Sequence, residues 1–221
     1  MGTPGSGFYD EINQDFGWYE GHAGHNLWPT DRASGAYIFR PTTQSPQYFN
    51  DSWGYAEVFK GPIVQEVHQY SEPGWVNQVI RVYPTDPDVE FEWLVGPIPI
   101  SDGIGKEIIT TYTSPGLNTE NTFYTDSNGR QMMKRVKDVR PTWKLNKTEP
   151  VSENYYPVNS RISTTSNSNG EFRQVTVLTD RSQGGSSMKN GQVAQTKKPM
   201  INIFRTVFYL KIWNKGGRKI T

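Results

Sequence analysis

Two neighbouring segments show the clearest alternation of apolar and polar positions in the chain. In residues 89–95 the odd positions hold valine, phenylalanine, tryptophan and valine, while glutamates occupy two of the even positions. In residues 75–83 the even positions hold valine, glutamine, isoleucine and valine. Because successive side chains of a β-strand point to opposite faces, this period of two predicts strands with one face on a core.

A turn signal lies between two extended runs at residues 123–139. The turn Asp126-Ser127-Asn128-Gly129 combines side chains that bond their own backbone with a glycine that accepts positive φ. We therefore expect a β-hairpin, with a strand rather than a helix over residues 130–139. Further runs rich in β-branched and aromatic residues predict strands at 36–39, 55–60, 63–70, 106–113, 161–163 and 171–180.

Short strands separated by turn signals roughly every 8–12 residues indicate an all-β chain that forms one or more antiparallel β-sandwiches. We divide the chain into three parts. Residues 1–45 are a loop-rich lead-in with the first short strand, and residues 46–193 are the β-sandwich region. Residues 194–221 are a basic and apolar tail that we expect to be poorly ordered.

The tail differs from the rest of the chain in charge. Residues 1–188 contain 15 basic and 22 acidic residues, whereas residues 189–221 contain eight basic residues and no acidic one. The apolar run at 201–213 is too short to span a bilayer but could lie on an anionic membrane surface. A surface helix needs one polar face, and here the apolar residues lie all round a helix. We therefore favour a run with no place in the fold.

Composition changes this picture only modestly. With 221 residues the chain is long enough for one or two domains, and 34% hydrophobic residues suit a globular protein. The absence of cysteine excludes disulfides and thiolate metal sites within the chain. A net charge of +1 gives no argument for nucleic-acid binding. The first residues lack the apolar core of a signal peptide.

The chain contains three histidines, which are the natural first candidates for metal ligation. His22 and His25 stand in a glycine-rich loop, and a zinc site needs a third ligand on a defined element. We therefore expect a solvated pair and assign no metal ligand. His68 lies in a predicted strand beside Glu66, so we expect a structural or surface role. The motifs of nucleophile elbows and phosphate loops do not occur.

Six stretches carry a resemblance to a known family. These stretches are ASGAYIFRP (33–41), EWLVGPIPISDGIGKEIIT (92–110), FYTDSNGR (123–130), RPTWKLNKTEPV (140–151), NYYPVNSRI (154–162) and LTDRSQGGSS (178–187). Through them the chain resembles the C-terminal β region of the lysosomal-type α-mannosidases of glycoside hydrolase family 38, over roughly residues 17 to 193.

The resemblance implies part of a retaining, zinc-dependent enzyme that hydrolyses terminal α-D-mannosyl residues of N-glycan oligosaccharides. In that family zinc is bound by two histidines and two aspartates of the catalytic domain, partly through a His-x-Asp motif. No histidine here is followed two places later by aspartate, so the resemblance implies no zinc ligand and no catalytic residue in this segment. It implies a fragment whose partners are mannose-containing oligosaccharide and its own N-terminal catalytic domain, without nucleic acid or a membrane span, in a lysosomal or secreted protein.

The resemblance also suggests residues at the rim of the sugar pocket. Tyr37 is the first candidate to stack on or hydrogen-bond a mannose, the alternative being a tyrosine of the sandwich core. Asp180 and Arg181 are a second candidate, the alternative being a structural ion pair or turn. Asn50 and Asn146 begin Asn-x-Ser/Thr sequons, and both are predicted to be glycosylated.

Two other functions remain open at this point. A stand-alone, lectin-like β-sandwich module would show an exposed row of tryptophan and tyrosine on one sheet face. A basic-tailed membrane or nucleic-acid binder would lose salt-dependent binding on deletion of residues 189–221.

Overall fold

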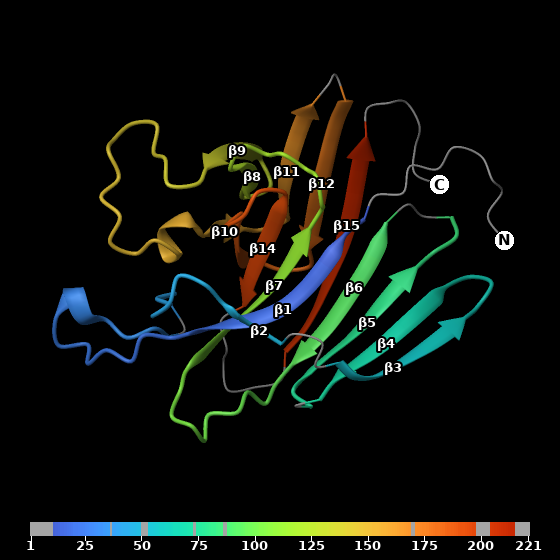
Figure 1. Ribbon diagram of the computed structural model, residues 1–221, viewed down its shortest axis with the longest axis horizontal. Helices are drawn as coiled ribbons and strands as arrows, with labels where there is room; N and C mark the ends of the chain where they lie inside the picture. Colours follow the sequence, from blue (N-terminus) through green and yellow to red (C-terminus); the bar gives the residue numbers. More distant parts are fainter. Residues whose placement is uncertain are drawn as a thin grey trace.

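The computed structural model describes residues 11–35, 37–49, 53–72, 74–85, 88–168, 171–197 and 204–214. Within these ranges the chain is all-β, with two short 3₁₀ turns, η1 (Pro29–Asp31) and η2 (Ser152–Asn154). Its strands form two antiparallel sheets (Figure 1). The predicted fold class is therefore confirmed.

The smaller sheet has six strands and the larger sheet has nine. The six-stranded sheet runs in the order β10 (Tyr156–Val158), β13 (Gln183–Ser186), β14 (Gln192–Lys197), β7 (Lys106–Thr113), β1 (Asn13–Glu20) and β2 (Gln47–Tyr48). The nine-stranded sheet runs in the order β3 (Trp53–Lys60), β4 (Gln65–Ser71), β5 (Val76–Val82), β6 (Val89–Val95), β15 (Phe204–Asn214), β12 (Glu171–Thr179), β11 (Arg161–Ser168), β8 (Thr122–Ser127) and β9 (Gln131–Val136).

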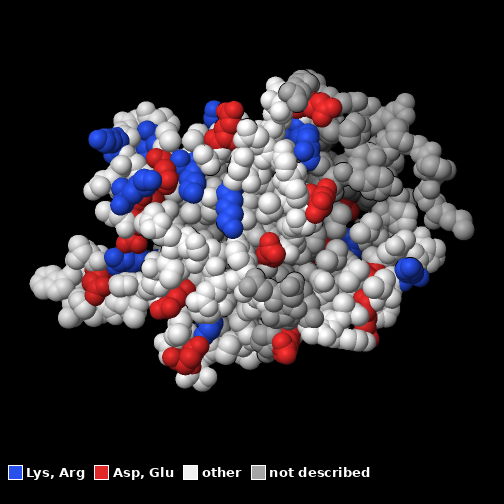
Figure 2. Space-filling model, in the orientation of Figure 1, with Lys and Arg blue, Asp and Glu red and all other residues white. Residues whose placement is uncertain are grey.

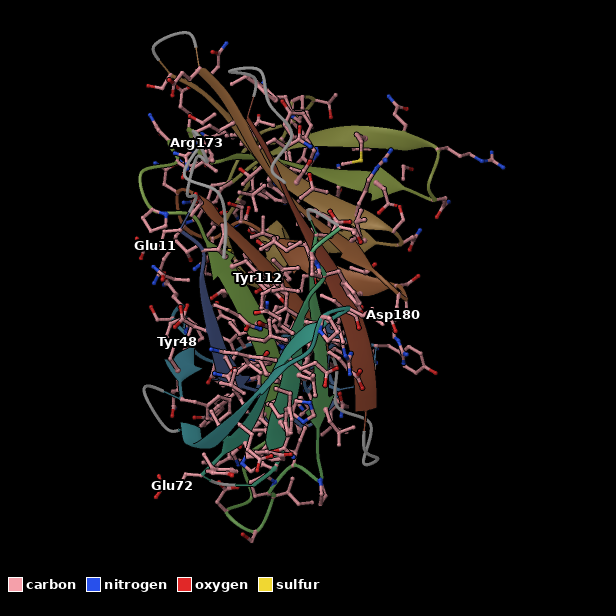
Figure 3. The ribbon with its side chains drawn as sticks, turned by 90° about the vertical axis from the view of Figure 1, so that its right-hand side faces the viewer. Glu11, Tyr48, Glu72, Tyr112, Arg173 and Asp180 are labelled. Carbon is pink, nitrogen blue, oxygen red and sulfur yellow. The ribbon has the colours of Figure 1, made fainter. Side chains whose placement is uncertain are left out.

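The main hydrophobic core lies between the two sheets. Strand β6 shows the predicted alternation, because Phe91, Trp93 and Val95 are buried while Glu90 and Glu92 are only partly buried. From the six-stranded sheet, Phe16 packs edge-on against Trp93 with ring centroids 5.5 Å apart. Tyr112 of β7 is fully buried among these side chains and lies centrally between the sheets in Figure 3.

The predicted hairpin is present as β8 and β9. Asn128 and Gly129 both have positive φ, 52° and 72°, as the two central residues of a type I′ turn do, and the Arg130 N–H bonds the Ser127 carbonyl oxygen at 2.9 Å. The Asp126 carboxylate accepts backbone N–H bonds from Gly129 at 2.9 Å and from Asn159 and Ser160 at 2.8 and 3.1 Å. This one buried carboxylate therefore joins the β8–β9 hairpin to the segment that leads into β11.

The first part of the chain differs from the prediction. The lead-in contains an eight-residue strand, β1, whereas no strand is present at residues 37–39, the part of the predicted strand that the structure describes. There, Gly35 and Ile38 make only an isolated bridge around a turn. Both faces of β1 are partly buried, so it lacks the alternation that identifies a strand with one exposed face.

The tail also differs from the prediction over the residues that the structure describes. Strand β15 pairs antiparallel with β6 on one side and with β12 on the other. A short apolar run is ambiguous between helix and strand by pattern alone, and here two flanking strands decide it. The expectation that the tail has no place in the fold is corrected for residues 204–214, and the boundaries at 45 and 193 stay predictions.

The outer face of the six-stranded sheet is covered by two long segments, which project to the left in Figure 1. We call residues 21–46 the lead-in loop and residues 137–155 the covering loop. Phe39 of the lead-in loop packs edge-on against Tyr19 of β1 and Tyr155 of the covering loop, at centroid distances of 5.9 and 4.7 Å. Ile109 and Val151 are buried in the same cluster. We call this second, smaller core the outer cluster.

Candidate functional site

Tyr37 lies at an exposed tip of the lead-in loop. Its side chain is 94% exposed, and the flanking residues close the turn through two backbone bonds, Gly35 N to Ile38 O at 2.8 Å and Ile38 N to Gly35 O at 3.2 Å. The alternative that Tyr37 belongs to the sandwich core is therefore wrong. The phenol is presented outward, where it can contact a ligand or another part of a larger protein.

The base of this turn is anchored to the sheet by Glu107. This glutamate lies on the outer face of β7, is 3% exposed and is hydrogen-bonded with Ser34 Oγ. The same Ser34 oxygen accepts the Arg40 N–H at 3.1 Å and lies 3.1 Å from the carbonyl oxygen of Ile38. A hydroxyl donates one hydrogen only. All three contacts are hydrogen bonds at once when Ser34 donates to Ile38 and Glu107 carries a proton that it donates to Ser34.

Arg40 joins the lead-in loop to the covering loop. Its Nε donates to Glu149 Oε1 at 2.8 Å, while its two Nη groups donate to the carbonyl oxygens of Arg32 and Thr30, each at 2.9 Å. A guanidinium that bonds three partners in a fixed fork limits the relative movement of the segments it connects. The two loops therefore form one connected layer over the sheet.

The histidine pair is more organised than the sequence suggests. Nε2 of His22 lies 2.6 Å from Asp31 Oδ1, and Nε2 of His25 lies 2.8 Å from Asp31 Oδ2. The hydrogen bond from His22 is the main cause that lowers the pKa of the Asp31 carboxyl. Both rings remain accessible to solvent, with 32% of the His22 side chain and 49% of the His25 side chain exposed, as expected for a solvated pair, and one carboxylate holds both of them. Among the residues that the structure describes, no group of three ligating side chains is placed to hold a metal.

The expectation of a structural or surface role for His68 is confirmed. Nε2 of His68 lies 2.9 Å from Glu66 Oε2 on the outer face of the nine-stranded sheet, and the ring packs against Phe59. The residue has a structural contact at a partly exposed position.

Asp180 and Arg181 bind each other after the end of β12. Nη2 of Arg181 lies 2.8 Å from Asp180 Oδ2, and both residues are exposed. In the part of the chain that is described, no hydrogen bond or ion pair joins either residue to Tyr37. Asp180 and Tyr48 lie on opposite sides of the molecule in Figure 3. The structure contains the ion pair between these two residues. A sugar contact of Asp180 and Arg181 stays a prediction.

The sequon at Asn146 lies in the coil of the covering loop. Asn146 is exposed, and the third sequon residue, Thr148, bonds Glu153 Oε1 through its N–H at 3.0 Å and through its hydroxyl at 3.2 Å. The amide of Asn146 is therefore accessible to a modifying enzyme. Asn50 lies outside the described residues.

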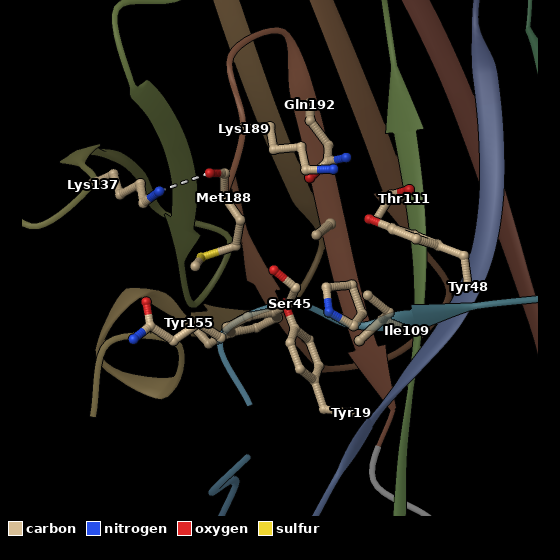
Figure 4. A pocket seen from close by; sticks show the side chains of 13 residues that line it. Tyr19, Ser45, Tyr48, Ile109, Thr111, Lys137, Tyr155, Met188, Lys189 and Gln192 are labelled. Carbon is tan, nitrogen blue, oxygen red and sulfur yellow. Dashed lines mark hydrogen bonds between the residues drawn. The ribbon is translucent and has the colours of Figure 1, made fainter. Parts of the chain in front are cut away.

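A pocket of about 270 Å³ lies on the outer face of the six-stranded sheet, beside the outer cluster (Figure 4). Strands β1, β7 and β14 form its floor, and its walls come from β2, the end of the lead-in loop, the two ends of the covering loop and the segment before β14. The lining residues are Tyr19, Gln44, Ser45, Pro46, Tyr48, Ile109, Thr111, Lys137, Tyr155, Met188, Lys189, Gln192 and Ala194.

Two of the phenols that line the pocket, those of Tyr19 and Tyr155, are neutral groups. Burial raises the pKa of Tyr155 well above its usual value. Burial and then the neighbouring Tyr48 raise the pKa of Tyr19, while a contact with Tyr155 acts in the opposite direction. These hydroxyls therefore remain protonated at ordinary pH and can both donate and accept hydrogen bonds.

Four residues of this region were not predicted from the sequence. Glu107 and Thr111 belong to a run that was recognised only as a β-branched strand, although a glutamate within such a run was an available signal. Lys137 and Lys189 gave no signal in the sequence, because their meaning depends on which loops meet over the sheet.

Comparisons with known proteins give the family context. The family model described as "Glycosyl hydrolases family 38 C-terminal domain" matches residues 8–196. The chain is 51% identical over 182 residues to the lysosomal alpha-mannosidase of Homo sapiens, a match that covers 82% of this chain and 17% of that protein. It is 50% identical to the lysosomal alpha-mannosidase of Bos taurus and 44% identical to the alpha-mannosidase of Canavalia ensiformis, with 17% and 18% of those proteins covered. The chain thus spans less than a fifth of the length of these relatives.

Proposed function

Because the chain belongs to the family of glycosyl hydrolase family 38 C-terminal domains, we propose that it is the β-sandwich segment of an α-mannosidase. In this proposal the whole protein hydrolyses terminal α-D-mannosyl residues of N-glycan oligosaccharides. The segment described here supports the catalytic domain and contributes to the rim of the sugar pocket, and it is not catalytic by itself.

The exposed position of Tyr37 carries the proposal. A large aromatic side chain that is 94% exposed, at the tip of a turn whose base is bonded to a buried glutamate, is well placed to contact a sugar. A turn that is already held in place before the ligand binds loses less conformational entropy on binding, and this favours affinity.

The zinc of the proposed enzyme has to be bound outside this segment. Each of the two neighbouring histidines, His22 and His25, places its Nε2 on an Asp31 oxygen, at 2.6 and 2.8 Å. Those distances are hydrogen bonds within the cluster, and in the described part of the chain no group of three ligating side chains is placed to hold a metal, which supports this placement. We assign zinc and the carboxylates of a retaining mechanism to the catalytic domain.

The activity test uses the chain alone and within a whole enzyme. The purified chain, assayed with a chromogenic α-mannoside and zinc, should give no turnover. A chimera in which it replaces the matching segment of the human relative should be active. In that chimera Tyr37→Ala should raise KM, whereas Leu27→Ala, at another exposed position of the same loop, should not. Zinc-dependent turnover by the chain alone, or identical kinetics for both variants, would contradict the proposal.

We also propose a lysosomal or secreted location, which is supported by the names of the lysosomal relatives and by the accessible sequon. Expression in a secretory host should give glycosylation at Asn146. Enzymatic removal of the glycan would then leave aspartate at this position in the peptide mass spectrum. An unmodified Asn146 in the secreted protein would count against this location.

A stand-alone sugar-binding module is the second candidate. It is favoured by exposed aromatic residues at one edge of the nine-stranded sheet, where the rings of Tyr55 and Tyr70 stack with centroids 6.0 Å apart. Binding of the purified chain to immobilised mannan that is abolished by Tyr55→Ala and Tyr70→Ala, but unaffected by Tyr37→Ala, would favour this module over the mannosidase segment.

A further inference from the structure

The pocket on the outer face has the size of one small ligand. Its volume of about 270 Å³ lies just below the range of roughly 300–1,000 Å³ that is usual for drug-sized molecules. The sheet forms its floor and separate loops form its walls, so its shape depends on the positions of all these segments. A single sugar ring with one substituent is a molecule of suitable size.

Thr111 supplies an unsatisfied polar group to this pocket. The residue is 1% exposed, and its Oγ1 has no hydrogen-bond partner among the residues that the structure describes. Figure 4 shows its side chain near that of Tyr48 in the pocket. Buried hydroxyls nearly always have a partner, because an unmade hydrogen bond costs free energy. A ligand hydroxyl in the pocket would supply that partner.

Two ammonium groups give the pocket a positive charge. Lys137 and Lys189 line it, and no aspartate or glutamate does. The Lys137 ammonium donates to the carbonyl oxygen of Met188 at 2.9 Å, and that of Lys189 lies 5.5 Å from the centroid of the Tyr48 ring. Each lysine thus has a neutral partner, and a lysine ammonium can make three hydrogen bonds.

The carboxylates of the covering loop are engaged elsewhere. Asp138 pairs with Lys147 at 2.9 Å, and Glu149 pairs with Arg40 at 2.8 Å. Figure 2 shows lysine and arginine gathered over the region that carries β9 and the covering loop. The two lysines of the lining are therefore the charged groups that a ligand in the pocket meets, and they favour an anion.

We propose that this pocket binds a monosaccharide that carries one anionic group, a phosphate or a carboxylate. The two lysines hold the anionic group, Thr111 and the tyrosine hydroxyls bond the sugar hydroxyls, and the aromatic rings pack on the ring carbons. The site is distinct from the exposed Tyr37 tip and does not depend on the proposed mannosidase function.

Isothermal titration of the purified whole chain tests the proposal with four probes: glucose 6-phosphate, glucuronate, glucose and inorganic phosphate. We expect glucose 6-phosphate or glucuronate to bind at least about tenfold more tightly than both glucose and inorganic phosphate, because charge-assisted and hydroxyl contacts add. Which of the two binds more tightly identifies the anionic group. The affinity should fall as salt is added.

Matched variants locate the binding. Lys189→Met and Thr111→Val should each weaken the better probe by about tenfold or more. Lys144→Met, which removes an exposed lysine of the covering loop that does not line the pocket, should leave the affinity unchanged. Circular dichroism melts would verify folding, and Lys189→Met alone is sufficient if Thr111→Val fails to fold. The proposal is overturned by an absence of binding, by equal binding of inorganic phosphate or glucose, or by equal effects of Lys189→Met and Lys144→Met.

Discussion

The outer faces of the two sheets differ in how far they are buried. On the six-stranded sheet, Ile109 and Thr111 are each 1% exposed, because the lead-in and covering loops lie over them. On the nine-stranded sheet, the outer face holds Arg81, whose side chain is 20% exposed and contacts Glu66, Glu90 and Glu92 at 2.6–2.7 Å. One face is a buried layer with a pocket, and the other is a charge network whose side chains are 13–25% exposed.

The difference shows that irregular segments can bury a sheet as completely as a second sheet does. Loops usually run over the surface because their backbone needs hydrogen-bond partners. Here the partners come from side chains, such as Asn154, which is fully buried and bonds the backbone N–H and the carboxylate of Asp138 at 2.8 Å each. The covering loop is thereby fixed, and it can hold one wall of a pocket.

Cavity-forming substitutions should separate the two outer faces most strongly. Ile109→Ala removes a side chain from the outer cluster and should lower the free energy of unfolding by about 2–4 kcal/mol, as in a true core. Val79→Ala, on the outer face of the nine-stranded sheet, should cost about 1 kcal/mol or less. Urea titration monitored by tryptophan fluorescence gives both values. Equal costs would mean that the loops do not form a second core.

Asp126 gives the next largest effect. Burial acts to raise its pKa, but backbone N–H bonds from Ser160, Gly129, Arg161 and Asn159 outweigh burial and lower it. The carboxylate therefore contributes stability above its unfolded pKa of about 3.9, and this contribution is lost as pH falls through the lower folded pKa. Asp126→Asn should cost about 2–3 kcal/mol at pH 7 and less at pH 2. A cost that does not change with pH would contradict this assignment.

Some of the residues in these predictions can be identified from the sequence alone, and others cannot. The alternation around Trp93 and the turn at Gly129 follow from local pattern, and both were predicted correctly. Strand β15 was missed because its pairing with β6 and β12 joins segments far apart in the chain.

The residues of the candidate site also differ in how far the sequence alone predicts them. Tyr37 was identified from a motif, but its exposure could not be inferred, since an aromatic residue in an apolar run is usually buried. The roles of Glu107 and Lys189 arise only when distant loops meet over the sheet.

Glu107 should show an intermediate effect that depends on the substituted group. Glu107→Ala should cost about 1–3 kcal/mol, since Ser34 loses its buried partner. Glu107→Gln should be nearly neutral, because its amide N–H can donate to Ser34 Oγ as a protonated carboxyl does. Hydrogen exchange at the Arg40 amide should accelerate in the alanine variant only. If Glu107→Gln is as destabilising as Glu107→Ala, Ser34 is the donor and Glu107 is ionised.

The charged outer face should show the smallest effect. The hydrogen bond from His68, followed by that from Arg81, lowers the pKa of Glu66, whose side chain is 25% exposed. Glu66→Gln should therefore cost at most about 1 kcal/mol at pH 7, and the cost should shrink in high salt. The stabilisation is present above the unfolded glutamate pKa of about 4.3 and is lost as pH falls through the depressed folded value. Glu171→Gln, at an exposed position where no described residue makes such a contact, is the control and should be neutral. A cost for Glu66→Gln as large as that of Ile109→Ala would show that the two outer faces are equally buried in solution.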